Sequence, residues 1–89
     1  MELLKALAAA LERGDHQQTL EITRQAIKQE IPAKRILDDG LVAGMSVVGE
    51  RFGAREIYLP DVLLAAKAMY AGLDQLEPLL EAGDMSAMG

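Results

Sequence analysis

Apolar side chains recur every three or four residues in the first part of the chain, which is the spacing of one helix face. They form two segments on either side of Gly14 and Asp15, a helix-terminating glycine followed by a favourable N-cap residue. Pro32 either ends the second segment or opens the next helix at its first position. The residues expected on the core-facing sides of these two helices are Leu3, Leu4, Leu7, Ala8, Leu11, Leu20, Thr23, Ala26 and Ile27.

A third helical pattern spans residues 33–52 and contains three glycines. Each glycine weakens a helix interior by about 1 kcal/mol relative to alanine. We therefore expect either a break near Gly40 or unusually close helix contacts at Gly44 and Gly49. The apolar stripe of this segment is Leu37, Leu41, Met45 (or Gly44), Val48 and Phe52.

A fourth pattern begins at Pro60, which suits the first turn of a helix, and Asp61 complements the positive end of that helix. The apolar residues that follow have spacings of three or four, which is typical of a seam that packs on other helices. Pro78 is expected to kink this helix or to restart its final turn. The predicted seam is Val62, Ala66, Met69, Leu73 and Leu76.

Four helical segments with short connections, and no alternating strand pattern of useful length, predict an all-α protein with the architecture of a four-helix bundle. The chain has 89 residues, which is the size of one small domain. We expect residues 1–82 to form this domain and residues 83–89 to form a tail or the start of a linker.

Charge and composition narrow the class of protein. The net charge is −5, from nine basic and 14 acidic residues, so the basic face of a nucleic-acid binder is missing. The chain has no cysteine, which excludes disulfides and thiolate metal sites and favours a cytoplasmic location. Uncharged stretches fall short of the roughly 20 residues that span a membrane. We therefore expect neither nucleic acid nor a membrane among the partners.

Side chains that could catalyse a reaction or bind a metal are sparse. His16 is the single histidine and lies beside Asp15 at a predicted helix start, which indicates a surface residue. Asp38, Asp39 and Glu50 are interpreted as helix surface charge, because the Glu-x-x-His pair of di-iron bundles is missing. No nucleophile stands near a base. We predict no catalytic residue, no metal ligand and no enzyme activity of this chain by itself.

The connection between the third and fourth patterns is unusually apolar for a helix hairpin. Phe52 precedes a short turn at residues 53–56, and Ile57, Tyr58 and Leu59 follow it. Leaving such side chains in water sacrifices roughly 1.5–3 kcal/mol each. Either they fold back and close the end of the bundle, or they form a binding surface, and the pattern alone favours neither.

The stretch from Gly40 to Leu80 carries the string GMxxVGERFGxxEIYLPDVxxAAxAM. It resembles the helical cap domain of corrinoid methyl carriers, a family that includes cobalamin-dependent methionine synthase and the corrinoid proteins of methanol, methylamine and methoxyarene metabolism. The resemblance implies a four-helix bundle over the upper face of a cobalamin that a separate doubly wound domain holds. It also implies that Phe52, Tyr58 and Leu59 contact the region of the upper axial ligand.

The departures from the family pattern are informative. In the family, an Asp-x-His-x-x-Gly motif in the following domain supplies the histidine that ligates cobalt, and this sequence runs to Gly89 without it. His16 does not lie in that context. The related light-sensing adenosylcobalamin repressors carry a Trp followed by Glu-His ten and eleven residues later. Here Phe52 is followed at those spacings by Val62 and Leu63, which favours a methyl carrier.

The resemblance therefore implies a cap that shields methylcobalamin from above while partner enzymes transfer the methyl group. The partners it implies are the cobalamin-binding doubly wound domain of the same full-length protein and methyltransferase subunits. The alternative is a stand-alone helical module that binds another protein through its apolar connection and seam. Without a cofactor to cover it, the apolar patch also favours self-association of the isolated chain, which the net charge of −5 opposes.

Overall fold

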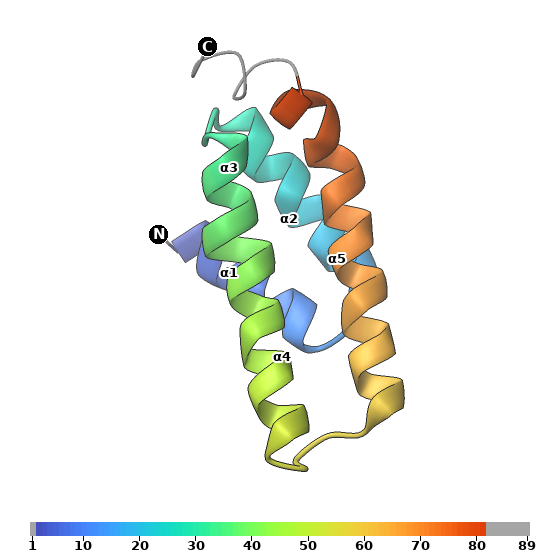
Figure 1. Ribbon diagram of the computed structural model, residues 1–89. Helices are drawn as coiled ribbons and strands as arrows, with labels where there is room; N and C mark the ends of the chain where they lie inside the picture. Colours follow the sequence, from blue (N-terminus) through green and yellow to red (C-terminus); the bar gives the residue numbers. More distant parts are fainter. Residues whose placement is uncertain (1, 82–89) are drawn as a thin grey trace.

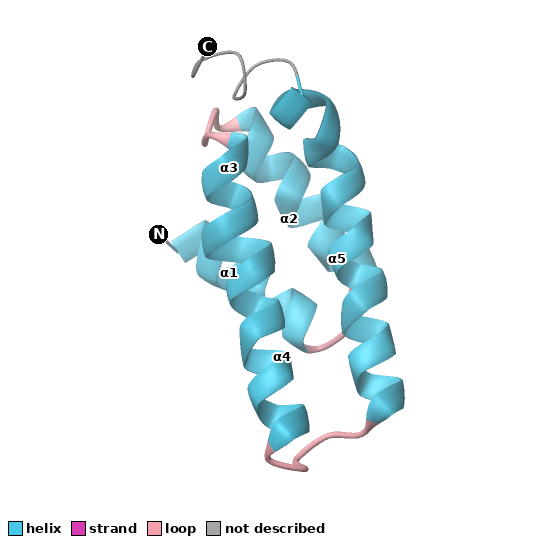
Figure 2. Ribbon diagram, viewed as in Figure 1, coloured by secondary structure: helices cyan, strands magenta, loops and turns pink. Residues whose placement is uncertain are grey.

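The computed structural model describes residues 2–81, and every regular element in that range is helical. Helices α3, η1 and α4 follow one another without a loop and form one rod, so the four rods make a bundle (Figures 1 and 2). The all-α prediction is confirmed, whereas the tail or linker predicted at residues 83–89 lies outside the described residues. The elements are α1 (Glu2–Glu12), α2 (His16–Lys28), α3 (Ala33–Ile36), η1 (Leu37–Val42), α4 (Ala43–Gly53) and α5 (Leu59–Leu79).

The predicted boundary between the first two helices is confirmed. Gly14 has φ +72°, a left-handed conformation that glycine adopts without a steric penalty. The Asp15 side chain caps α2 by accepting a hydrogen bond from the Gln18 N–H at 3.1 Å. The chain therefore reverses direction over the three residues between α1 and α2.

Glycine is replaced by larger residues at two other helix ends. Glu30 after α2 and Arg55 after α4 have φ angles of 63° and 65°. Each occupies the same position as Gly14, in the Schellman motif that ends α1, α2 and α4. Left-handed backbone at a residue with a Cβ costs roughly 1–2 kcal/mol. These two helix ends are therefore formed at a cost in stability.

The break expected near Gly40 takes the form of the wider π-helix η1, which changes the register of the rod without ending it. A Cβ at Gly40 would lie 2.5 Å from Leu7 Cδ2, so the missing side chain leaves room for α1. Gly44 makes a similarly close contact with Ala8. Gly49 has no neighbour within 4 Å, so the expectation of close contact is right for Gly44 and wrong for Gly49.

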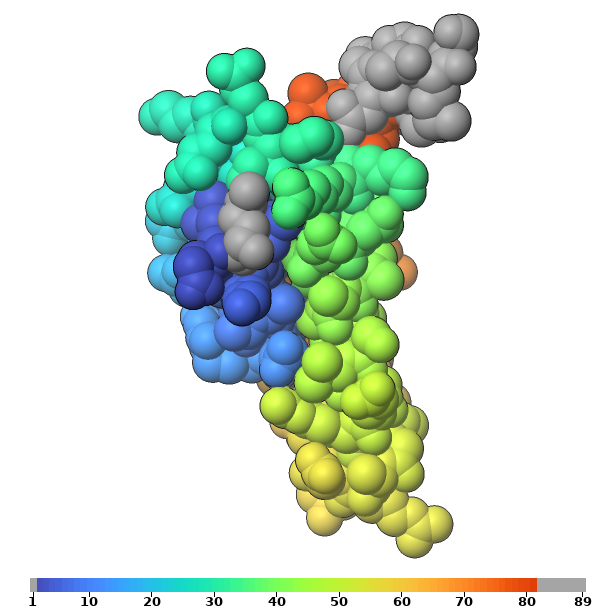
Figure 3. Space-filling view, turned by 90° about the vertical axis from the view of Figure 1, so that its left-hand side faces the viewer, coloured from blue at the N-terminus to red at the C-terminus, as the bar shows by residue number. Residues whose placement is uncertain are grey.

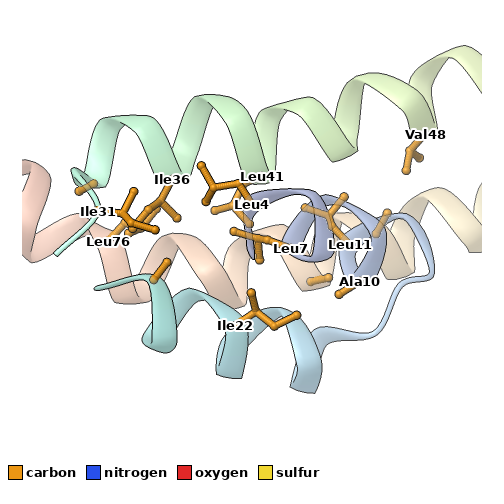
Figure 4. Close-up of a cluster of buried hydrophobic side chains, with 14 residues drawn as sticks. Leu4, Leu7, Ala10, Leu11, Ile22, Ile31, Ile36, Leu41, Val48 and Leu76 are labelled. Atoms are coloured by element: carbon orange, nitrogen blue, oxygen red, sulfur yellow. The ribbon is translucent and has the colours of Figure 1, made fainter. Parts of the chain in front are cut away.

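The core lies between α1 and the other rods, with α5 packed mainly on α2 and α4 mainly on α1. Figure 4 shows leucines of α1 pointing toward side chains of the third rod and of α5. Of the residues predicted on the core-facing side of α1, the leucines at 4, 7 and 11 are in this core, whereas Leu3 and Ala8 are only half-buried. Large side chains of the core include Leu4, Leu7, Leu11, Ile22, Ile36, Leu41, Val48 and Leu76.

The prediction for α2 was partly wrong. Thr23 and Ala26 are buried as expected, but Leu20 and Ile27 are only half-buried. Thr19 and Ile22 are buried with them. The threonines tolerate burial because their hydroxyls donate to the carbonyls four residues earlier, at 2.8 Å for Thr19 and 2.7 Å for Thr23.

The predicted seam of α5 is rotated away from the centre of the core. Only Leu76 of the seam is buried, and its other members are half-buried. The innermost face consists instead of Ala65, Ala68, Gly72 and Leu76. A Cβ at Gly72 would lie 2.8 Å from a methyl of Leu41 and 3.2 Å from the Thr23 hydroxyl oxygen. Small residues thus let α5 approach the neighbouring rods closely.

Helix α5 runs through Pro78 to Leu79, so of the two effects predicted for this proline, a kink or a restart, the restart does not occur. At the end of the bundle opposite Pro78, α4 and α5 extend beyond the α1–α2 hairpin and are joined by a short loop (Figures 1 and 2). We call residues 52–59 the tip. In the space-filling view this part of the molecule narrows and projects from the body of the bundle (Figure 3).

Candidate functional site

The tip carries the apolar side chains that the sequence singled out. Phe52 is 45% exposed, Tyr58 73% and Leu59 56%. Ile57 behaves differently, because it is half-buried and packs against the core. One of the four side chains therefore folds back to close the bundle, and the other three form an exposed apolar surface.

Backbone hydrogen bonds determine how the tip leaves α4. The Arg55 N–H donates to the Phe52 carbonyl at 3.1 Å, and the Glu56 N–H donates to the Arg51 carbonyl at 2.8 Å. Arg55 itself is in the left-handed conformation. A strained residue at an exposed turn persists only where surrounding structure holds it. Here the motif turns the chain sharply away from α4 just after Phe52.

A second interaction fixes the backbone at the start of α5. Tyr58 has extended backbone, with φ −115° and ψ 172°, and its N–H donates to Asp61 Oδ2 at 3.0 Å. The Asp61 carboxylate also lies in the first turn of α5, where negative charge is favourable. This bond orients Tyr58 and Leu59 at the start of the helix. The predicted role of Asp61 at the helix start is confirmed.

The apolar surface continues from the tip along one side of α5. The half-buried members of the seam follow Leu59 at intervals of three or four residues, so they share its side of the helix. Val62, Met69 and Leu73 contact the core and still keep part of their surface exposed. The half-buried members of the seam are Val62, Ala66, Met69 and Leu73.

Several charged side chains on the bundle form ion pairs with one another. Arg51 pairs with Glu12 at 3.3 Å, which ties the end of α4 to α1. Asp38 and Asp39 are exposed and pair with cations four residues earlier, as their interpretation as surface charge requires. The Asp38 carboxylate raises the pKa of the Lys34 ammonium through a hydrogen bond at 2.9 Å.

His16 is exposed in the first turn of α2, in line with its interpretation as a surface residue. Within residues 2–81, no three His, Cys, Asp or Glu side chains are arranged to hold a metal ion. None of the helices in that range is both long enough and apolar enough to cross a membrane.

Sequence reasoning missed exposed apolar residues on α5 beyond Leu59, and the two most exposed of them lie on one side of the helix. Leu63 is 61% exposed and Tyr70 68% exposed. They follow Leu59 by four and eleven residues, which places all three on the side of α5 opposite its buried face. The spacing of these two residues from Leu59 is visible in the sequence, but the prediction considered only the seam on the neighbouring side of the helix.

Comparison with known proteins identifies the class. Residues 3–77 match the family described as "B12 binding domain". The chain belongs to this family of B12-binding domains. Its all-helical fold and its apolar tip are the features that the resemblance to corrinoid cap domains implied.

Particular relatives are corrinoid proteins. The chain is 38% identical over 80 residues to monomethylamine corrinoid protein 2 of Methanosarcina barkeri. It is 36% identical over 86 residues to a corrinoid protein of Desulfitobacterium hafniense. These matches cover 90% and 97% of this chain but only 37% and 40% of the relatives, so the chain spans well under half of their length.

A solved structure shows the same fold. The structure of the Methanosarcina barkeri monomethylamine corrinoid protein superposes with a TM-score of 0.88 at 34% sequence identity. The match covers 91% of this chain and 38% of that protein. The bundle therefore corresponds to one part of a larger corrinoid protein.

Proposed function

We propose that this chain acts as the cap of a corrinoid methyl carrier and shields the upper axial face of methylcobalamin during methyl transfer. The observation that carries the proposal is the exposed apolar tip on a bundle of the B12-binding family. Phe52, Tyr58 and Leu59 are the residues proposed to face the cofactor. We propose residues 1–82 as the cap domain, with residues 83–89 as a tail or the start of a linker.

The side chains of the tip fit this role. Phenyl, phenol and isobutyl groups present shape and dispersion to a ligand, and none of them ligates cobalt. When bound, cobalamin supplies the methyl–cobalt bond. Phe52 and Leu59 would exclude water from the space above that bond. The Tyr58 hydroxyl can donate a hydrogen bond to polar groups at the edge of the cofactor. The hydrogen bond from Tyr58 to Asp61 holds two of these residues in position.

The remaining functions belong to other parts of the system in this proposal. A separate doubly wound domain holds the cobalamin and ligates the cobalt, and methyltransferase subunits carry out catalysis, all in the cytoplasm. The contact of this chain with cobalamin is restricted to the upper face. The lid must also move aside when a methyltransferase reaches the cobalt, and a rigid bundle can do this as one body.

The direction of α5 constrains how a cobalamin domain in the same chain would be connected. Helix α5 begins at the tip and its 21 residues carry the chain about 30 Å away, at ~1.5 Å per residue (Figure 1). A domain held against the tip would therefore need a returning linker of about nine extended residues at ~3.4 Å each.

A chimeric protein tests the proposal. Residues 2–81 would replace the matching part of the Methanosarcina barkeri monomethylamine corrinoid protein, and the product would be loaded with methylcobalamin. We expect light to remove the methyl group more slowly from the chimera than from the same protein without any cap. Absorbance at fixed light intensity measures both rates.

A chimera variant in which Phe52 and Leu59 are both changed to serine is the control for a specific role of the tip. Its circular dichroism should match that of the parent chimera, because both side chains are exposed. We expect its photolysis rate to approach that of the capless protein. If the parent chimera is folded and yet loses its methyl group as fast as the capless protein, the proposed shielding is wrong.

A further inference from the structure

Helix α5 has an outward face on the side opposite its buried residues. At about 100° per residue, the positions farthest from Ala65, Ala68, Gly72 and Leu76 recur every three or four residues along the whole helix. All of them are exposed. We call this set the α5 outward face; it consists of Leu59, Leu63, Lys67, Tyr70, Asp74 and Glu77.

The half of this face nearer the tip is mainly apolar. Leu63 lies about 6 Å and Tyr70 about 16 Å along the helix from Leu59, at ~1.5 Å per residue. Leu63 and Tyr70 are among the most exposed large apolar side chains of the described chain. The shielding proposed for the tip does not require Tyr70, which stands three turns away from it. An aligned apolar strip of this kind is typical of a surface that another molecule covers.

The other half of the face is acidic. Asp74 and Glu77 are exposed, and neither of them forms an ion pair with a residue of the described range. They also lie toward the carboxyl end of α5, whose last turn has no basic residue. Negative charge at that end of a helix is unfavourable, because the helix dipole is negative there. Natural proteins place charges at positions that lower local stability mainly at functional sites.

We propose that the α5 outward face is a docking surface for another protein, whose own surface presents an apolar patch beside lysine or arginine side chains. Leu63 and Tyr70 of the apolar half are buried against that patch. The acidic half meets the basic side chains and sets the orientation of the complex. Lys67 lies between the two halves, where its aliphatic stem extends the apolar strip and its ammonium reaches solvent.

The charges disfavour a second copy of this chain as the occupant. If two outward faces paired in parallel, Asp74 and Glu77 would face the same acids of the partner. In an antiparallel pairing that matched the full faces, the acids would lie against Leu59 and Leu63. A partner with complementary basic groups avoids both arrangements. The acidic half also disfavours an anionic membrane surface.

The docking surface is independent of cobalamin. The two surfaces share only Leu59: the proposed shielding uses it together with Phe52 and Tyr58, whereas the docking proposal rests on Leu63, Tyr70 and the acids beyond them. A binding experiment without cofactor therefore tests the docking surface alone. Its failure would leave the shielding proposal intact, and failure of shielding would leave the docking proposal intact.

The experiment uses the full 89-residue chain labelled with ¹⁵N and an amphipathic helical peptide made of leucine and lysine. A peptide of the same pattern with glutamate in place of lysine is the comparison. We expect the lysine peptide to shift the amide resonances of residues 63–77 and to bind more weakly as salt is added. The glutamate peptide should bind at least about tenfold more weakly, because its charges repel the acidic half.

Variants distinguish binding at this surface from nonspecific attraction between the charges of the peptide and the chain. Leu63→Gln with Tyr70→Gln should weaken binding of the lysine peptide by about tenfold or more. Asp74→Asn with Glu77→Gln should weaken it several-fold. The matched control is Glu2→Gln with Glu21→Gln, which removes the same charge from exposed positions on α1 and α2 and should change the affinity least.

Several results would overturn the proposal. The peptide could perturb another face, the control pair could weaken binding as much as Asp74→Asn with Glu77→Gln, or both peptides could bind equally. Sedimentation equilibrium provides a further check. A dimer of the chain alone that Leu63→Gln dissociates would show that a second copy occupies the face.

Discussion

The backbone of Ala8 lies against Gly44 so closely that a Cβ at residue 44 would be 2.8 Å from the Ala8 carbonyl oxygen and 3.1 Å from its Cα. Both neighbours are backbone atoms, so they cannot give way as the end of a side chain can. The absence of a side chain at Gly44 therefore sets the separation of α1 and α4. Gly49, five residues later in α4, has nothing within 4 Å.

The same substitution at these two glycines should have opposite effects on stability. Gly44→Ala is expected to destabilise the bundle by roughly 1–3 kcal/mol, because α1 and α4 must move apart. Gly49→Ala is expected to stabilise it by about 1 kcal/mol, because alanine is the better helix former and space is free. Urea denaturation followed by circular dichroism measures both. Equal changes at the two positions would contradict the close contact between α1 and α4.

Helix ends offer a second test of stability. Glu30 is in the left-handed conformation, and the N–H of Ile31 after it donates to the Ala26 carbonyl at 3.1 Å. Glu30→Gly should stabilise the fold by about 1 kcal/mol, because glycine removes the steric penalty of that backbone. Thermal unfolding measures the change, and a lowered melting temperature would refute the account of this helix end.

Gly14 provides the reverse test. It has φ +72°, and a Cβ there would lie 2.8 Å from the Leu64 Cβ. Gly14→Ala should therefore cost at least about 1–2 kcal/mol from the backbone alone. Urea denaturation is again the measurement, with exposed Ala6→Gly in α1 as a comparison that costs about 1 kcal/mol through helix propensity. A smaller loss for Gly14→Ala than for Ala6→Gly would be inconsistent with the structure.

Phe52→Ala separates a role at the surface from a role in the core. Since Phe52 is nearly half exposed, we expect a small fall in melting temperature and faster photolysis of methylcobalamin in the chimera described above. Leu41→Ala is the core control, because Leu41 is fully buried and its truncation should cost ~2–5 kcal/mol. A stable Phe52→Ala chimera with unchanged photolysis would reject the role of Phe52 and leave Tyr58 and Leu59 as candidates.

The chain by itself should bind methylcobalamin weakly or not at all. A lid contacts one face of the cofactor, and the tip side chains Phe52, Tyr58 and Leu59 offer no ligand for cobalt. Calorimetry should therefore show no saturable heat at micromolar concentrations. His16→Gln should leave this result unchanged, because His16 is an exposed residue of α2. Tight stoichiometric binding would contradict a role restricted to the upper face.

Much of the fold could be predicted from local sequence signals. Gly14 with Asp15 and Pro60 with Asp61 mark helix ends through interactions within a few residues, and the structure confirms both boundaries. The apolar tip was also evident, because Tyr58 and Leu59 interrupt a connection where polar residues are usual. Such features depend on the chain near the residue concerned, so they can be inferred without knowing the packing.

Packing between helices decided the rest. The sequence by itself determined that α5 is a helix with apolar residues on more than one side, but only contact with α2 and η1 buried the small face that includes Gly72. The larger seam and the outward leucines were thereby left at the surface. In the same way, Ile57 packs on the core while Tyr58 beside it remains exposed. Hydrophobicity alone does not predict which of these faces is buried. The buried face is the one that lets the neighbouring helices approach most closely.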